Sequence, residues 1–375
     1  MNLATAFRVR VRVRVPRAAG ARAPTPRRRA ARRAVLSGAA ALAALTAGMA
    51  VALDVGRPQW RDPEFYVRLD RLKRWQAEAP DRPLVVAFGS SRTQNAINPA
   101  AMGYPDRPGS PLVFNMGYRG ARPLAAYLHF TRTLDAGVRP RAVLFQIATS
   151  EVGEANGVEG LSRIWAPRLS IGDMARFAPY SKTPTATPPR WLGDRLKPWA
   201  TYRVALVDEW APGWLTQAER NGCVWDQADA YGYVQHPLAT VTPKQREANF
   251  AIIRKNPHQH HSDFQPEEFV WRVLQGEVSR CRAEGVAVAF YWIPNSPAYW
   301  SWHPPGDRAR VAAYQRRIEA ELGAVVFPYP PDDLLAEEDF ADGHHFLRRG
   351  AEKYSRWLAD THLSPWLRSQ GLIGP

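Results

Sequence analysis

Two short segments near opposite ends of the chain carry residues that could form a nucleophilic catalytic site. The first is Gly-Ser-Ser-Arg-Thr at residues 89–93, which follows an apolar run and leads into a helical pattern. Glycine permits a tight bend there, and the start of a helix offers N–H groups and positive potential to a developing oxyanion. A serine in this turn could therefore act as a nucleophile. The alternative is that it only caps the helix, as serine commonly does.

The second segment is Asp-Gly-His-His-Phe-Leu at residues 342–347. Asp342 stands three residues before His345, so its carboxylate could accept a hydrogen bond from the imidazole Nδ1–H while Nε2 faces a nucleophile. A solvated turn is the alternative for this motif alone. A third segment, Asn-Met-Gly-Tyr-Arg-Gly at residues 115–120, lets backbone approach a ligand, and Gly120 could direct an N–H to the same point. An ordinary turn is the alternative there.

Together, these segments resemble the sequence blocks of the SGNH (GDSL-type) serine hydrolases. The resemblance covers roughly residues 83–153 and 283–361. It implies a catalytic triad in which Ser91 is the nucleophile, His345 is the general base and Asp342 orients the imidazole. The start at Gly-Ser-Ser is most similar to that of membrane-anchored bacterial members that act on cell-envelope polymers.

The resemblance also implies an oxyanion hole formed by the N–H groups of Ser91 and Gly120, with a third donor after the third strand. The family has Gly-x-Asn-Asp at that place, and this chain has Ala-Thr-Ser-Glu at residues 148–151. Ser150 therefore occupies the position of the Asn, and its hydroxyl, or that of Thr149, is the expected donor. If neither hydroxyl replaces the amide, the rate deficit would be on the order of tenfold to a thousandfold.

Three side chains beside these motifs are candidates for substrate binding. They are Arg92, Asn115 and His344. Arg92 could hold an anionic group, and a surface salt bridge is the alternative. We expect no metal site and no cofactor, because the histidines of Pro-His-Gln-His-His at residues 257–261 lack a recognisable ligand spacing with a carboxylate or cysteine.

Tryptophans offer a further kind of binding surface. Trp292, Trp300 and Trp302, with those of residues 154–265, could stack on sugar rings. Because tryptophan is first a large hydrophobic side chain, we expect most of them to pack and two or three to line a groove.

The elements that must position these residues follow from the hydrophobic pattern. Five short apolar runs, of the kind found in strands buried on both faces, alternate with helical patterns. The runs are residues 83–88, 112–114, 142–147, 286–293 and 324–327. This alternation predicts an α/β fold with a doubly wound, parallel, five-stranded sheet, at whose carboxyl edge reactive groups gather.

Around the sheet, the chain divides into segments. Residues 54–82 are predicted to be a linker with one amphipathic helix, and residues 83–365 to be the SGNH-like domain. About residues 154–265 interrupt the alternation with a long stretch rich in Pro, Trp and Tyr, which is too long for a simple loop. We interpret this stretch as an inserted cap.

The N-terminus predicts membrane attachment. Residues 1–33 form a basic, disordered tail with eleven arginines and no acidic residue, which leaves only +4 of the net charge of +15 to the rest of the chain. Residues 34–53 are uncharged and long enough to cross a bilayer. Arginines before them favour a signal-anchor with a cytoplasmic N-terminus. A cleaved export signal and a buried helix of a soluble protein are the alternatives.

Composition excludes several classes of protein. With 45% hydrophobic residues the chain is expected to fold, and only two cysteines argue against a disulfide framework. No nucleic-acid partner is expected, because aromatic residues do not interleave the arginines. Cys223 and Cys281 could pair outside the cytoplasm or remain buried thiols.

The expected function is therefore that of a serine esterase or O-acyltransferase in the bacterial inner membrane. A single span would place its catalytic domain in the periplasm or outside. Its expected partners are an acylated glycan or a small ester, and the membrane. The alternative is a non-catalytic binding or assembly factor for envelope polysaccharide that retains the fold.

Overall fold

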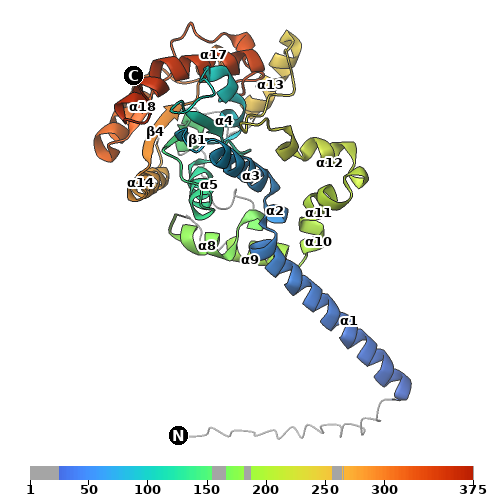
Figure 1. Cartoon of the computed structure of the whole chain (residues 1–375). Coiled ribbons are helices and arrows are strands. Elements are labelled where there is room, and N and C mark those ends of the chain that lie inside the picture. Colours follow the sequence, from blue (N-terminus) through green and yellow to red (C-terminus); the bar gives the residue numbers. More distant parts are fainter. Residues whose placement is uncertain (1–24, 154–165, 181–186, 256–263, 265, 375) are drawn as a thin grey trace, which may run out of the picture. The chain divides into compact units, whose positions relative to one another are not determined.

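The structure is a computed structural model that describes residues 25–153, 166–180, 187–255, 264 and 266–374. Its centre is one sheet of five parallel strands in the order β2-β1-β3-β4-β5 (Figure 1). The strands are β1 Leu84–Phe88, β2 Leu112–Asn115, β3 Ala142–Ile147, β4 Ala287–Trp292 and β5 Val325–Phe327. The prediction of an α/β fold with a five-stranded parallel sheet is confirmed. Because all strands are parallel, their carboxyl ends meet at one edge of the sheet.

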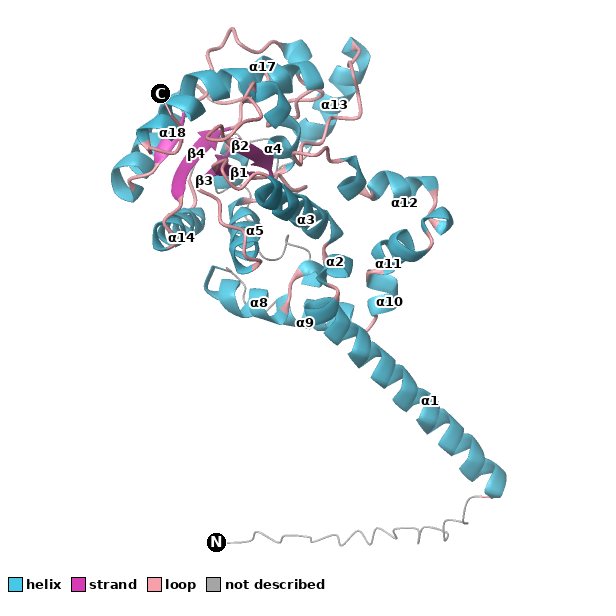
Figure 2. Ribbon diagram, viewed as in Figure 1, coloured by secondary structure: helices cyan, strands magenta, loops and turns pink. Residues whose placement is uncertain are grey.

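Helices cover both faces of this sheet (Figure 2). Alternate side chains of β1 point to opposite sides, so Val86 and Phe88 join one apolar core while Val85 and Ala87 join the other. The first core includes helices α3 Pro63–Glu78, α5 Pro123–Asp135, α14 Glu268–Ala283 and α16 Asp307–Arg317. The second includes α17 Arg348–Leu358 and α18 Ser364–Ser369. The strands are mostly apolar because both faces of the sheet are covered.

Short helices connect these elements and carry the polar segments. They are α2 Pro58–Arg61, α4 Ser91–Ala96, α6 Thr149–Val152 and α15 Pro297–Trp300. Helix α4 begins directly after β1, and α6 directly after β3. Both therefore start at the carboxyl edge of the sheet.

The predicted cap is an insertion between β3 and α14. Gly153 and Pro266 form an isolated antiparallel bridge, which holds the two ends of the insertion together. The described helices within it are α8 Ile171–Phe177, α9 Thr187–Arg195, α10 Pro198–Thr201, α11 Arg203–Trp210, α12 Gln217–Gly222 and α13 Pro243–Lys255. The cap is therefore helical over much of its described length.

The chain separates into two units, Met1–Gly48 and Met49–Pro375. Helix α1 spans Pro26–Val51 and continues as a π-helical turn to Gly56, and this stretch is long and apolar enough to cross a membrane. The helix begins eight residues before the predicted start at residue 34. The assignment of residues 26–33 to a disordered tail is therefore wrong, because Pro26 suits the first turn of a helix and arginine favours helix. Residues 1–24 lie outside the described part.

The two cysteines are both free and buried. Cys223 packs in a small cap cluster with Leu215 and Trp225, whereas Cys281 lies in the core formed by α14. Burial raises the pKa of the Cys223 thiol to about 11, so this thiol stays protonated at neutral pH. Of the two alternatives from the sequence, the buried thiols hold and the disulfide does not.

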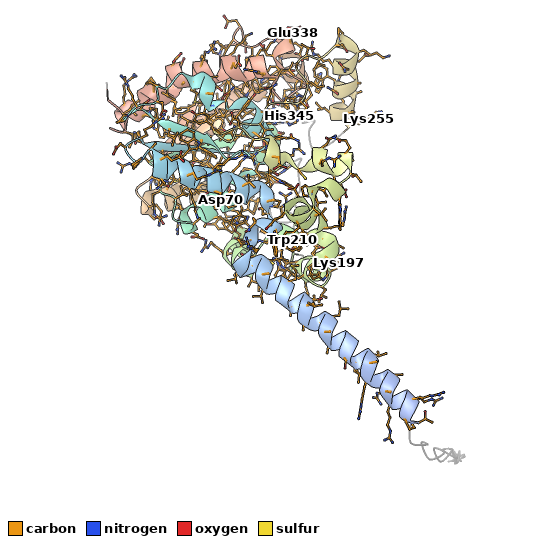
Figure 3. The ribbon with its side chains drawn as sticks, turned by 45° about the vertical axis from the view of Figure 1, so that its right-hand side comes forward. Asp70, Lys197, Trp210, Lys255, Glu338 and His345 are labelled. Atoms are coloured by element: carbon orange, nitrogen blue, oxygen red, sulfur yellow. The ribbon has the colours of Figure 1, made fainter. Side chains whose placement is uncertain are left out.

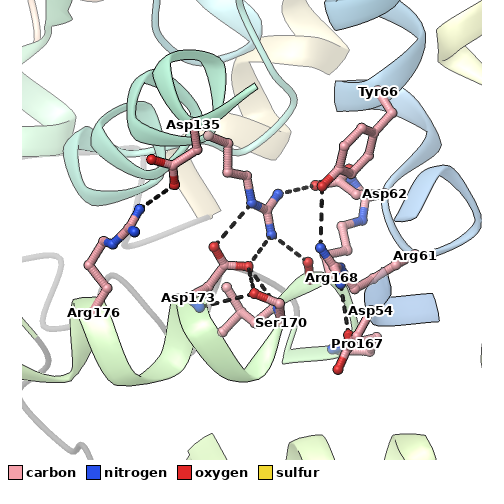
Figure 4. A network of polar contacts seen from close by, with 12 residues as sticks. Asp54, Arg61, Asp62, Tyr66, Asp135, Pro167, Arg168, Ser170, Asp173 and Arg176 are labelled. Carbon is pink, nitrogen blue, oxygen red and sulfur yellow. Dashed lines mark hydrogen bonds and ion pairs between the residues drawn. The ribbon is translucent and has the colours of Figure 1, made fainter. Parts of the chain in front are cut away.

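A buried arginine joins the cap to the sheet domain. Arg132 of α5 donates to Asp62, which precedes α3, and to Asp173 of α8, each at 2.8 Å. Asp173 also closes a capping box with Ser170 at the start of α8 (Figure 4). The side chains of Arg132, Asp62 and Asp173 are 6%, 1% and 10% exposed, so each charge depends on its partners rather than on water.

We predict that Arg132→Met lowers the free energy of unfolding by about 3–5 kcal/mol, because two buried carboxylates lose their cation. Urea unfolding of the full chain in detergent measures this change. Arg176→Met is the matched control, since Arg176 pairs with Asp135 at the surface, where an ion pair contributes about 0–1 kcal/mol (Figure 4). Equal losses in the two variants would contradict the structural role of Arg132.

Candidate active site

The turn after β1 places two serines in different roles. Ser90 is the N-cap of α4, and its hydroxyl accepts from the N–H of Arg92 at 3.3 Å. Ser91 is the first residue of the helix. The capping role therefore belongs to Ser90, whose hydroxyl also hydrogen-bonds to Gln146. The side chain of Ser91 has another partner.

That partner is His345, although 254 positions separate the two residues in the chain. Ser91 Oγ lies 2.8 Å from His345 Nε2, and His345 Nδ1 lies 2.8 Å from Asp342 Oδ2. The predicted contact between Ser91 and His345 is thus confirmed. The carboxylate of Asp342 hydrogen-bonds to the far side of the His345 imidazole, as the three-residue spacing between them indicated. The His345 side chain is 21% exposed, so the site is open to solvent.

The carboxylate of Asp342 is held in its charged form. Its Oδ1 accepts from the backbone N–H of His344 at 2.8 Å and of His345 at 2.7 Å. Burial alone would raise the pKa of Asp342, but the two neighbouring imidazoles and these hydrogen bonds hold it well below its usual value. An ionised Asp342 favours the His345 tautomer that carries its proton on Nδ1, which leaves Nε2 to accept from Ser91.

The loop that carries Asp342 and His345 is a tight turn fixed on both sides. Phe340 and Phe346 form an antiparallel bridge across it, and the N–H of Ser296, in the segment after β4, donates to Gly343 O at 2.9 Å. A Cβ at Gly343 would lie 2.5 Å from the Tyr299 ring, so only glycine fits here. The turn is therefore held against the loop that follows β4.

A buried glutamine, Gln146 at the end of β3, holds the serine turn in place. Its Oε1 accepts from the N–H groups of Ser90 at 3.0 Å and Thr93 at 3.1 Å, while Nε2 donates to Glu151 at 2.7 Å. The Thr93 hydroxyl also hydrogen-bonds to Tyr291 of β4 at 2.7 Å. Gln146 was not among the residues predicted from the sequence, although a lone polar residue within an otherwise apolar strand was a signal that could have identified it.

Glu151 was missed as well. Burial raises the pKa of its carboxyl group, against the opposing effects of Arg92 and of hydrogen bonds with Ser90 and Gln146. It follows Ser150 in the segment that departs from the family pattern, and it faces the serine turn through Gln146.

The predicted oxyanion donors lie in three different surroundings. The N–H of Ser91 lies in the first turn of α4, where no i→i−4 partner precedes it. Gly120 lies in an exposed turn with φ +67°, and no atom lies within 4 Å of the place where a Cβ would be. Ser150 is buried in α6, beside Thr149. The roles of Gly120, Ser150 and Thr149 stay predictions.

The three candidate substrate contacts differ. Asn115 is fully buried, and within the described part of the chain its side chain hydrogen-bonds only to backbone atoms. Its Nδ2 donates to the carbonyl oxygens of Thr93, Gln94 and Ile97, and its Oδ1 accepts from the N–H of Gly117. Its assignment to substrate binding is therefore wrong, because it joins β2 to α4.

Arg92 is 4% exposed and donates to Asn295 Oδ1 at 3.1 Å, so the alternative of a surface salt bridge is also wrong. His344 is buried against His345, with 4.3 Å between ring centroids, and burial holds its pKa well below the usual value. Its part in substrate binding stays a prediction.

Asp342, His344 and His345 also offer three ligand atoms within 4.8 Å of one another, a spacing that could hold a metal ion. Both oxygens of Asp342, however, already accept hydrogen bonds from His345 and the backbone. We therefore interpret the group as a triad. The histidines of residues 257–261 lie outside the described residues.

No protein-family model matches this sequence, and no curated protein matches it. The interpretation of the site therefore depends on its geometry and chemistry.

The lowered pKa of Asp342 predicts a pH-dependent contribution to stability. A carboxyl whose folded pKa is depressed stabilises the fold above its unfolded pKa of about 3.9, and loses that contribution as pH falls through the folded value. Asp342→Asn should therefore cost about 1.5–3 kcal/mol at pH 7. The difference from wild type should shrink below about pH 4 when urea unfolding is measured across pH.

The matched control is Asp332→Asn, which removes a carboxylate that is 78% exposed and paired with Arg308 at the surface. This variant should differ from wild type by less than about 1 kcal/mol. A difference between wild type and Asp342→Asn that grows below pH 4 would contradict the ionised state of Asp342.

Proposed function

We propose that this protein is an SGNH-type serine esterase or O-acyltransferase that works through an acyl-enzyme. The single observation that carries the proposal is the continuous hydrogen-bonded chain from Ser91 through His345 to Asp342, with 2.8 Å at each link. A serine hydroxyl, an imidazole and a buried carboxylate in that order make up the constellation that activates a serine for attack on an ester.

In the proposed reaction, His345 Nε2 takes the proton from Ser91 Oγ as the oxygen attacks the ester carbonyl. The tetrahedral oxyanion is stabilised by the N–H groups of Ser91 and Gly120, with Ser150 or Thr149 as a third donor. The C–O bond to the leaving alcohol then breaks, and that alcohol receives the proton from His345. Water or a sugar hydroxyl attacks the resulting serine ester by the reverse sequence and releases the acyl group.

The proposed substrate is an ester-linked acyl group on an envelope glycan. Hydrolysis and transfer differ only in the second nucleophile, because the first half of the reaction is common to both. A non-catalytic binding factor is the alternative, favoured by the serine in the Asn position of the third block.

We further propose that α1 anchors the protein in the bacterial inner membrane, with residues 55–375 on the outer side. The arginines at 27–33 precede the apolar stretch, which favours a cytoplasmic N-terminus. Met49 and Leu53, at the end of that stretch, pack with Tyr202 and Leu206 of the cap.

The cap exposes tryptophans close to this point. They are Trp199, Trp210 and Trp214, at 46%, 62% and 83% exposure. Trp210 contacts Trp60 edge-on at 5.2 Å, and His345 lies well apart from Trp210 and Lys197 (Figure 3). Exposed tryptophan suits the interface between headgroups and acyl chains, so the cap offers a second, peripheral contact with the bilayer.

A fluorophosphonate probe tests the enzymatic proposal, since it phosphonylates only an activated serine. We expect the full chain to be labelled and Ser91→Ala to be unlabelled. Ser90→Ala is the matched control, because it removes the neighbouring hydroxyl, which caps α4 and hydrogen-bonds to Gln146 rather than to His345. This variant should still be labelled.

His345→Ala should slow the labelling about a thousandfold or more, as removal of the general base does in serine hydrolases. Absence of labelling in the wild-type protein would support the non-catalytic binding factor. Labelling that survives Ser91→Ala would place the nucleophile elsewhere.

The orientation of the domain predicts the behaviour of reporter fusions. Alkaline phosphatase fused after Pro375 should be active in a Gram-negative bacterial host, because it folds only outside the cytoplasm, and a green fluorescent protein fusion should be dark. Replacement of the arginines at 27–33 by glutamate should weaken this preference. A fluorescent C-terminal fusion would contradict the proposed orientation.

A further inference from the structure

A groove of about 760 Å³ lies at the carboxyl ends of β4 and β5. This volume falls within the roughly 300–1,000 Å³ of ligand pockets. Its lining includes Asn295 and Trp300 from the segment after β4, Arg308 of α16, and Tyr329 and Asp332 from the segment after β5. None of these residues belongs to the proposed triad.

The groove is connected to the serine through one buried contact. Asn295, in its lining, accepts from Arg92, the residue that follows Ser91. In the strand order, β4 and β5 are the second and third strands from β1, so the groove begins about 10–14 Å from the strand that positions Ser91. An ester-bearing sugar at Ser91 would not reach that far by itself, whereas a short oligosaccharide would.

The walls combine rigid apolar surfaces with hydrogen-bonding groups. Pro294, Pro297, Pro328, Pro330 and Pro331 line the groove together with the aromatic rings of Trp300 and Tyr329. Trp300 meets Tyr329 edge-on at 5.3 Å, and the Arg308 guanidinium lies 5.3 Å from the Trp300 ring centroid. These contacts hold the rings in place before any ligand arrives.

Two polar atoms of the lining lack partners within the described part of the chain. They are Asn295 Nδ2 and the Tyr329 hydroxyl, both buried. Buried donors of this kind cost free energy unless a hydrogen bond satisfies them, and ligand hydroxyls can supply it after a small local adjustment. At the rim, Arg308 and Asp332 form a bidentate pair at 3.0 Å, so the charges there balance.

We propose that this groove binds the glycan of the acylated substrate and holds an uncharged oligosaccharide segment to one side of Ser91. Flat apolar faces interrupted by hydrogen-bonding groups fit a sugar ring, which has apolar C–H faces and polar hydroxyl edges. A long acyl chain would instead require a wall without polar atoms. The role of the bound glycan in ester chemistry rests on the proposed function, but the groove can be tested separately.

The test compares two tryptophans of one segment in the full chain in detergent. Trp300→Ala removes a groove wall, and Trp302→Ala is the matched control, since Trp302 does not line the groove and packs on Phe250, Arg254 and Tyr299. Arg308→Ala is a second groove variant at an exposed position, where loss of folding is not expected. Substrates are O-acetylated xylan, p-nitrophenyl acetate and p-nitrophenyl decanoate.

We expect Trp300→Ala to lower kcat/KM for acetylated xylan tenfold or more, while p-nitrophenyl acetate hydrolysis stays within about twofold of wild type. Arg308→Ala should lower the xylan value in the same direction, and Trp302→Ala should change neither. An equal loss on all substrates, or none on xylan, would overturn the glycan groove. A loss confined to the decanoate would overturn it in favour of an acyl-chain site.

A binding measurement tests the groove independently of catalysis. Xylotetraose should bind Ser91→Ala in titration calorimetry, and the added Trp300→Ala substitution should weaken binding tenfold or more. This result would support the groove even if the fluorophosphonate fails to label the wild-type protein. No xylotetraose binding at millimolar concentration, in a protein that the probe does label, would overturn the groove and leave the esterase proposal standing.

Discussion

The arrangement of the candidate site depends on the close approach of β3 to Gly89, directly after β1. A Cβ at this position would lie 2.6 Å from that of Gln146, so a larger residue would separate β1 from β3. The missing side chain lets the Gln146 amide reach the backbone of Ser90 and Thr93, and Thr93 in turn reaches Tyr291. The start of α4, and with it Ser91, is thereby fixed to the sheet rather than to a free loop.

The histidine side of the site is fixed in a different way. Asp342 and His345 lie in a turn that is bridged at its base and packed, through Gly343, on Tyr299. Tyr299 belongs to the same segment after β4 that supplies Asn295 to Arg92. One segment therefore supports the His345 imidazole, contacts α4 and forms a wall of the groove, which links the groove to the position of the candidate site.

The cap and the N-terminal segment are attached at some distance from this chemistry. Buried ion pairs of Arg132 with Asp62 and Asp173 join α5, the start of α3 and the first described cap helix, and Arg195 joins Asp54 to the cap. Because these charges are shielded from water, separating the elements would expose or orphan them at high cost. The segment from Asp54 to α3 is thus tied to the cap by specific contacts.

Much of this protein was already determined by local patterns in its sequence. Apolar runs of strand length specify the parallel sheet because both faces are buried, and the spacing of Asp342 and His345 places both side chains in one turn. Residues that act through distant partners could not be assigned in this way. Asn115 seemed available to a ligand and Arg92 to solvent until the folded chain showed both buried, while Gln146 and Asn295 gained their roles only from neighbours on other strands. A hydrogen bond between residues far apart in the chain is set by strand order and packing, which tertiary structure alone decides.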